Sequence, residues 1–190
     1  GLADQALAQA EGLGDSRWVC LDHAASATVG DDHHAWHSLL DQALKQQRFE
    51  LYFQPVVASQ DTALVLHYKV LSRLIDEQGQ AIPAGRFLPW IERFGWSARL
   101  DRLMLERVLE QMADHEASLA LNLSSATLAN PQALGKVFET LRAHSHFGPR
   151  LTLEIGEEQL PEQAELEDLT RQLRELGFSL SLQHFGGRFS

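Results

Sequence analysis

The sequence predicts an α/β fold with a parallel sheet and helices outside it, and three observations predict this. From residue 49 onward, segments with strand-like alternation and segments with helical periodicity follow one another. The three later strand segments carry a leucine or another large apolar residue at every second position, opposite small or polar residues. The chain of 190 residues, 44% of them hydrophobic, is sufficient for a buried core. Repeated strand–helix units form either an open sheet or a closed barrel, and periodicity leaves both open.

The individual elements are bounded by turn and capping signals. The expected strands are 50–57, 63–72, 118–123, 150–155 and 178–184. The expected helices are 35–48, 84–95, 101–113, 131–145 and 161–176. Asp31 and Asp32 are expected to cap the first helix. The last helix is the best marked, because Pro161 lies in its first turn and Gly177 follows its end.

The polar side chains of the later strands must face a polar environment, but a parallel sheet covered by helices has no solvent-facing side. The interior mouth of a barrel provides such an environment. Asn122, Glu154 and Gln183 then lie at the C-terminal strand ends, where barrel enzymes keep their sites. The alternative is that these residues only close the strand ends through hydrogen bonds.

Composition limits the class of function. A net charge of −10 argues against a general nucleic-acid-binding surface, which requires a basic face, but not against one small anionic ligand. Cys20 is the only cysteine, so no internal disulfide forms and a reducing compartment is expected. No apolar run reaches the roughly 20 residues that span a bilayer. Membrane attachment is therefore expected only through segments outside this chain, which itself reads as a soluble piece of a longer protein.

Several motifs make the chain similar to EAL domains, the cyclic-di-GMP phosphodiesterase family. They follow in the family's order over 49–190: LYFQPVV at 51–57, RFLPWIE at 86–92, LNLS at 121–124, LTLEI at 151–155 and FG at 185–186. The resemblance implies a TIM-like (β/α) barrel of the EAL type, of which this chain holds the N-terminal part. Residues 1–22 resemble the last helix and strand of a GGDEF domain, and 23–48 are expected to be a linker and connecting helix.

The resemblance also locates departures from the family's metal site. Lys-Val-Leu at 69–71 stands where the family has Glu-Ala-Leu, so an ammonium group replaces the first metal ligand. Gln183 and His184 replace two aspartates, whereas Asn122 and Glu154 match. The family's hydrolysis is two-metal chemistry held by carboxylates. We therefore expect no metal, no cofactor and no catalysis.

Nucleotide binding is expected to survive these departures. The residues that the resemblance assigns to a cyclic-di-GMP site are Gln54, Lys69, Leu71, Arg73, Asn122 and Glu154. Period-two spacing places Lys69, Leu71 and Arg73 on one face of a strand. Arg73 matches the family's phosphate-contacting position, where a guanidinium group grips a phosphate at two points. Lys69 is expected to replace the lost cation, either against a phosphate or in a salt bridge with Glu154.

The Lys-Val-Leu triplet, VLHY at 65–68 and QHFGGRF at 183–189 are most similar to inner-membrane cyclic-di-GMP receptors with degenerate GGDEF and EAL modules. That likeness implies a receptor on the cytoplasmic side of the bacterial inner membrane. Nucleotide binding there drives homodimerisation and inside-out signalling to a periplasmic protease that controls biofilm adhesion. Gly187, Arg188 and Phe189 fall in the family's dimerisation loop, although Phe189 has the alternative role of covering an open side of the barrel.

Other readings stay open. His33 and His37 have the i, i+4 spacing of a helical zinc pair with His34 between them, but no third ligand completes the set, and the alternative is a solvated helix start. Three functions are consistent with the motifs. They are a cyclic-di-GMP receptor without catalysis, a protein-interaction module without nucleotide binding, and an active phosphodiesterase.

Overall fold

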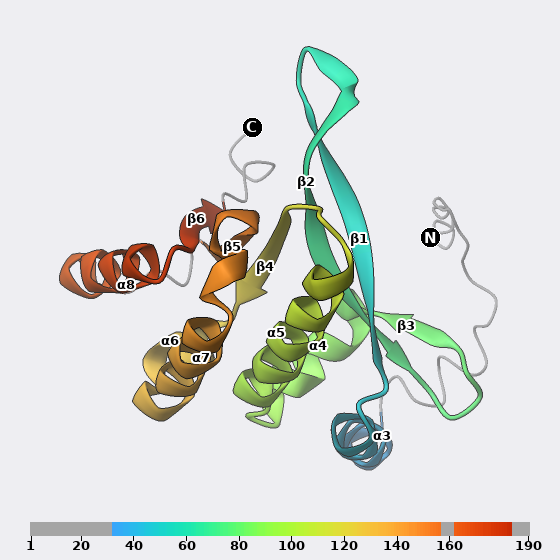
Figure 1. The fold of residues 1–190 in the computed structure, drawn as a ribbon. Coiled ribbons are helices and arrows are strands. Elements are labelled where there is room, and N and C mark those ends of the chain that lie inside the picture. The colour runs from blue at the N-terminus through green and yellow to red at the C-terminus, as the bar shows by residue number, and fades with distance from the viewer. Residues whose placement is uncertain (1–31, 157–161, 184–190) are drawn as a thin grey trace. The chain divides into compact units, whose positions relative to one another are not determined.

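The computed structural model describes residues 32–156 and 162–183 (Figure 1). In chain order the elements are α3 (His33–Gln46), β1 (Phe49–Ala58), β2 (Asp61–Ile75), β3 (Ala81–Pro83), α4 (Ala84–Arg93), α5 (Ser97–Asp114), β4 (Leu119–Leu123), α6 (Ser125–Ala129), α7 (Pro131–Ala143), the 3-10 helix η1 (Ser145–Arg150), β5 (Leu151–Gly156), α8 (Gln163–Glu175) and β6 (Ser179–Gln183). Every strand and helix expected from residue 35 onward is present, with shifted ends. The short elements β3, α6 and η1 are additional. The expected module at 1–22 and the loop at 187–189 lie outside the described residues.

The sheet is mixed, and the expectation of an all-parallel sheet is wrong. Its strand order is β1-β2-β4-β5-β6, with β3 also paired to β2. The strands β2, β4, β5 and β6 are parallel, whereas β1 and β3 run antiparallel to β2. The physical reason is the connection at 59–60, because two residues close a hairpin but cannot make the crossover that parallel strands need.

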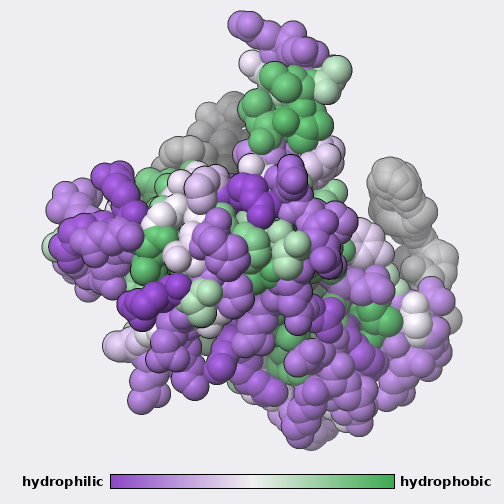
Figure 2. Space-filling view, viewed as in Figure 1, coloured by the Kyte–Doolittle hydropathy of each residue, from purple (hydrophilic) through white to green (hydrophobic). Residues whose placement is uncertain are grey.

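The β1–β2 hairpin extends past the N-terminal end of β4, since β2 pairs with β4 only at Tyr68 and Lys69, opposite the first two residues of β4 (Figure 1). Apolar residues gather near its tip, where Leu64 is 53% and Leu66 is 55% exposed (Figure 2). Three consecutive exposed apolar residues, Leu64 to Leu66, are more than the scattered single ones that a surface ordinarily carries.

The leucine-rich faces predicted for β4 and β5 lie in the core. The helices α4 and α5 pack on β2 and β4, and the short helix η1 packs on β5. The core residues that the two strands contribute are fully or nearly fully buried: Leu119, Leu121, Leu123, Leu151, Leu153 and Ile155. Burying a leucine contributes roughly 1.5 to 3 kcal/mol, so these residues fix which sheet face the helices cover. The polar alternate positions consequently lie on the other face.

Helix α3 begins where the sequence predicts a cap. The Asp32 carboxylate accepts a hydrogen bond from the His34 backbone N–H at 2.9 Å, and the Asp32 carbonyl accepts one from the Trp36 N–H at 3.0 Å. The helical spacing predicts a buried apolar stripe of Trp36, Leu39, Leu40, Ala43 and Leu44; all are buried except Leu39, which is half-buried. Within residues 32–156 and 162–183, no three His, Cys, Asp or Glu side chains are grouped to hold a metal ion. In the same ranges no helix has the length and apolarity of a membrane span.

A close approach of two glycines joins η1 to the end of α8 and gives a testable prediction. A Cβ atom at Gly148 would lie 2.4 Å from the carbonyl oxygen of Gly177, which itself has φ +92°. We expect Gly148→Ala to lower the free energy of unfolding by about 1 to 3 kcal/mol, because backbone must move. Urea denaturation measures this. The control is Gly135→Ala on α7, where a Cβ meets nothing within 4 Å and should be neutral or stabilising.

Candidate functional site

The face of the β1–β2 hairpin away from the helices carries most of the predicted site residues. The antiparallel register places Gln54 opposite Lys69, Tyr52 opposite Leu71 and Glu50 opposite Arg73. Side chains at directly opposite positions share a sheet face. The intervening β2 residues Val70, Ser72 and Leu74 are buried on the helix-covered face. Lys69, Leu71, Arg73 and Gln54 therefore share one face, and only half-buried or exposed positions lie on it.

The neighbouring strands bring Asn122 and Glu154 to the same sheet face. Asn122 is paired with Glu154 in the β4–β5 register, and Ser181 follows on β6. The Lys69 Nζ atom lies 4.0 Å from the Glu154 Oε1 atom, so the ion pair spans β4. The side chains remain 25% and 14% exposed, respectively. The sequence leaves two alternatives for Lys69, a contact with a phosphate or a salt bridge with Glu154. The structure contains the contact with Glu154.

The Glu154 carboxylate is only partly satisfied. Its Oε1 atom is buried and accepts no hydrogen bond from the residues that the structure describes. A separation of 4.0 Å from Lys69 is a long ion pair rather than a hydrogen bond. A buried acceptor without a donor costs about 1 to 3 kcal/mol, so this oxygen is available to a ligand's N–H or O–H group.

The side-chain groups at this site do not fit a pair of divalent cations. Asn122 and Glu154 offer the oxygen atoms that Mg²⁺ prefers, but the group beside Glu154 is the ammonium of Lys69. A cation placed there would be repelled by Lys69, which already supplies positive charge to the carboxylate. The side chain of Gln183 and all of His184 lie outside the description, although the Gln183 backbone pairs with Gly156.

Arg73 is held by an aromatic ring. Its guanidinium carbon lies 4.8 Å from the centroid of the Tyr52 ring, and its Nη1 donates one long hydrogen bond, 3.5 Å, to the Ser72 carbonyl. No ion pair of Arg73 occurs within the two described ranges. Sequence reasoning missed Tyr52, although its position two residues before Gln54 on a strand places it on the same face.

A buried carboxylate fixes the chain just after Asn122. The Asp101 Oδ2 atom accepts hydrogen bonds from the Ser124 N–H at 2.8 Å, the Ser124 hydroxyl at 2.7 Å and the Thr127 hydroxyl at 2.6 Å. Burial raises the pKa of Asp101 above its ordinary value, and these hydrogen bonds oppose the rise. Asp101 lies on α5, far from β4 in sequence, so no spacing pattern predicts this network.

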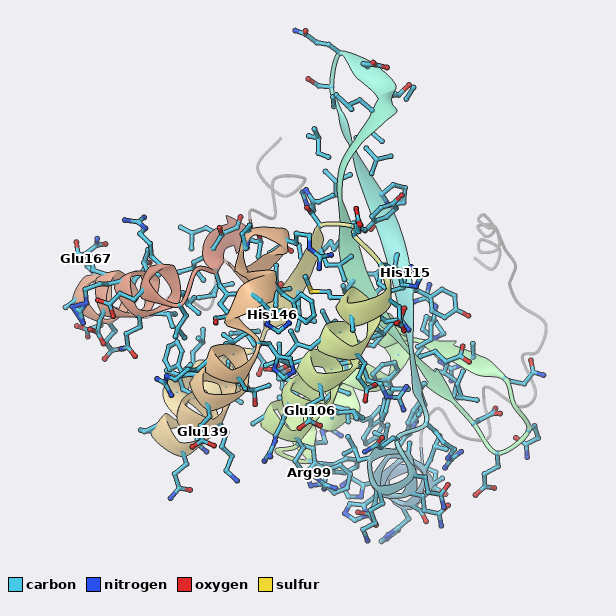
Figure 3. The ribbon with its side chains drawn as sticks, in the orientation of Figure 1. Arg99, Glu106, His115, Glu139, His146 and Glu167 are labelled. Atoms are coloured by element: carbon cyan, nitrogen blue, oxygen red, sulfur yellow. The ribbon has the colours of Figure 1, made fainter. Side chains whose placement is uncertain are left out.

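The helical layer is a different environment. Charged side chains such as Glu106 on α5 and Glu139 on α7 extend from the helices (Figure 3). Glu106 is half exposed and forms an i, i+4 pair with Arg102, which is the ordinary arrangement of a solvated helix surface. The polar residues of the opposite sheet face are not spread in this way, because they converge across β1, β2, β4 and β5.

These features define an α/β domain with a mixed sheet, in which a polar site lies on the sheet face opposite the helices. The chain belongs to the EAL domain family, whose family profile matches residues 38–190.

Known relatives are consistent with this membership. The chain is 27% identical over 161 residues to the cyclic di-GMP phosphodiesterase PdeF of Escherichia coli, a match that covers 82% of this chain and 21% of PdeF. The EAL domain of FimX from Pseudomonas aeruginosa, solved bound to c-di-GMP, is 29% identical with a TM-score of 0.66, over 78% of this chain and 61% of the solved EAL-domain chain. Vibrio cholerae LapD (S helix-GGDEF-EAL, bound to c-di-GMP) shares the fold at 22% identity and a TM-score of 0.71, over 83% of this chain and 39% of that solved chain. The chain thus spans about a fifth of the curated relative's length.

Proposed function

We propose that this EAL domain is a receptor that binds cyclic-di-GMP without hydrolysing it. The observation that carries the proposal is the Lys69 ammonium 4.0 Å from the Glu154 carboxylate. Lys69 occupies the position at which the family resemblance places a metal-binding glutamate. Unit charges about 4 Å apart interact by roughly 1 to 4 kcal/mol at effective dielectric constants of 80 to 20, and a dication doubles this. Replacing a metal ligand by a cation therefore removes the basis of two-metal hydrolysis.

Binding is supported by the groups that remain on the same sheet face. Arg73 and Lys69 supply positive charge for the phosphates of a cyclic dinucleotide, despite the net charge of −10 of the whole chain. Gln54 and Asn122 supply amide groups, and Leu71 supplies apolar surface. The likeness to the FimX EAL domain, which was solved with c-di-GMP bound, supports the same ligand class for this chain.

The finer proposal concerns the intact protein. The similarity of 65–71 and 183–189 to degenerate membrane-bound receptors favours a position on the cytoplasmic side of the inner membrane. Nucleotide binding would there drive homodimerisation through Gly187, Arg188 and Phe189, and the signal would reach a periplasmic protease that controls adhesion. We propose no nucleic-acid partner, because a net charge of −10 argues against the basic face that such binding requires.

A protein-interaction module without nucleotide binding is the second candidate. The exposed apolar tip of the β1–β2 hairpin favours it, because Leu64 and Leu66 are both more than half exposed. The two candidates differ in whether cyclic-di-GMP binds at all, so one titration separates them.

Calorimetric titration of the intact protein with cyclic-di-GMP in EDTA tests the proposal. We expect binding with the same Kd, within about twofold, in EDTA and in Mg²⁺, because Lys69 supplies the positive charge. Lys69→Glu should weaken binding in EDTA about tenfold or more, since a second carboxylate then lies beside Glu154 and the phosphates. Lys69→Gln, which removes charge without reversing it, should lose less. Binding that requires Mg²⁺ would contradict the proposal, and absence of binding would favour the interaction module.

A further inference from the structure

Tyr52 belongs to the site face but has no assigned part in it. Its position opposite Leu71 places it between the Glu50–Arg73 and Gln54–Lys69 pairs of the hairpin. Tyr52 and Arg73 are thus diagonal neighbours across two strands, a spacing that aromatic and long side chains bridge. The 4.8 Å separation of the guanidinium from the ring centroid lies within the range of a cation–π interaction.

We propose that Tyr52 is a ligand-positioning residue of the cyclic-di-GMP site, which orients the Arg73 guanidinium toward a phosphate and presents its ring to a guanine base. The proposal rests on the proposed function and deepens it. Tyr52 would hold the guanidinium of Arg73 through its ring, where a binding-site arginine is often held by a carboxylate.

Arg73 is held by its contact with the Tyr52 ring. A carboxylate partner would occupy the guanidinium N–H groups, whereas a ring stacked against the guanidinium plane leaves them pointing outward. Besides Tyr52, Arg73 contacts the Ser72 carbonyl through one long hydrogen bond of 3.5 Å. Glu50 is directly opposite Arg73 on the same face, yet the two make no ion pair. The N–H fork of Arg73 therefore remains available for a phosphate.

Tyr52 also offers an exposed ring surface of its own. With the guanidinium in place, 41% of Tyr52 is still exposed. Exposed rings beside a cationic group form the platforms on which nucleic-acid bases stack, and such stacking tolerates any base because each has a π-face. Gln54 lies two residues away on the same face and supplies hydrogen-bonding groups for a base edge.

The adjacent residue provides a matched control. Phe53 is also 41% exposed and lies on the same strand, but it is opposite Val70 and so on the other sheet face. A change at Phe53 reproduces the loss of an exposed aromatic residue from β1 without touching Arg73. Comparing the two positions separates an effect on the site from an effect on the hairpin.

The test is the Kd of cyclic-di-GMP, measured by calorimetry with the intact protein in EDTA, for Tyr52→Leu, Tyr52→Phe, Phe53→Leu and Arg73→Ala. Tyr52→Leu should weaken binding by about five- to tenfold through the lost cation–π and stacking contacts. Tyr52→Phe keeps the ring and should restore binding to within about twofold of wild type, as should Phe53→Leu. The double variant, Tyr52→Leu with Arg73→Ala, should lose less affinity than the product of the two single losses, because Tyr52 acts partly through Arg73.

Each outcome is decisive. Tyr52→Leu with wild-type affinity, while Arg73→Ala binds weakly, would overturn the role of Tyr52 and leave the proposed function standing. Equal losses in Tyr52→Leu and Phe53→Leu, with matching losses of unfolding free energy, would assign Tyr52 to hairpin stability and also overturn the role. Failure of the wild-type protein to bind would instead overturn the proposed function, and the role of Tyr52 with it.

Discussion

Arg73→Ala is expected to weaken the binding of cyclic-di-GMP by about 10- to 100-fold. A hydrogen bond to a charged group contributes about 1.5 to 3 kcal/mol, and each 1.4 kcal/mol corresponds to a factor of ten in Kd. Arg73 is the site-face cation without an ion pair in the described ranges, whereas the Lys69 charge is shared with Glu154. Calorimetry in EDTA measures the change directly.

Two further variants sharpen this result. Arg73→Lys keeps the charge but loses the planar fork, so its affinity should lie between wild type and alanine. The control is Arg93→Ala, because Arg93 also stacks on a ring, 5.0 Å from the Trp90 centroid, but lies on α4. An equal loss of affinity in Arg73→Ala and Arg93→Ala would show that removing any ring-contacting arginine weakens cyclic-di-GMP binding. That result would count against a phosphate contact of Arg73.

Asp101→Ala is expected to lower the free energy of unfolding by about 2 to 4 kcal/mol. The substitution removes the carboxylate oxygen that accepts three hydrogen bonds. One of the donors, the Thr127 hydroxyl, belongs to a residue that is only 1% exposed. Urea denaturation at neutral pH gives the value. Asp101→Asn retains an acceptor oxygen and should lose clearly less. Asp114→Ala, at the exposed end of the same helix, should change stability by no more than about 0.5 kcal/mol.

The pH dependence of stability carries a further signature of Asp101. Burial raises its pKa above the ordinary value of 3.8, so the folded state binds the proton more tightly than the unfolded state does. The resulting stabilisation is fully present below 3.8 and is lost as pH rises through the folded-state pKa. Relative to Asp101→Asn, the wild-type free energy of unfolding should therefore fall as pH rises across this window. A difference that grows with pH would show that the hydrogen bonds, rather than burial, dominate.

The sequence predicted the faces of the strands better than their directions. Alternation of leucines identifies the buried side of β4 and β5, because a side chain's face depends only on local spacing. The antiparallel β1–β2 pair departs from the strand–helix repeats of the later chain, which predict parallel strands. The interval between the strands expected at 50–57 and 63–72 is the signal that identifies a hairpin, since it is too short for a crossover.

The site residues also divide into those placed by local spacing and those placed by strand pairing. The common face of Lys69, Leu71 and Arg73 follows from period-two spacing, and the register places it as the spacing indicates. The approach of Lys69 to Glu154 across β4 depends on the register of three strands, so the sequence left it as one of two alternatives. Asp101 was missed altogether, because a contact between α5 and the loop after β4 has no periodic signal.

The measurement that tests the central claim most directly combines binding and turnover in one sample. The intact protein is incubated with cyclic-di-GMP and Mg²⁺ or Mn²⁺, nucleotides are separated by chromatography, and Kd is determined by calorimetry on the same preparation. We expect saturable binding and no linear dinucleotide above a no-protein control, because Lys69 takes the place of a metal ligand beside Glu154. Metal-dependent formation of the linear dinucleotide that is abolished by Glu154→Gln would contradict it and would identify an active phosphodiesterase.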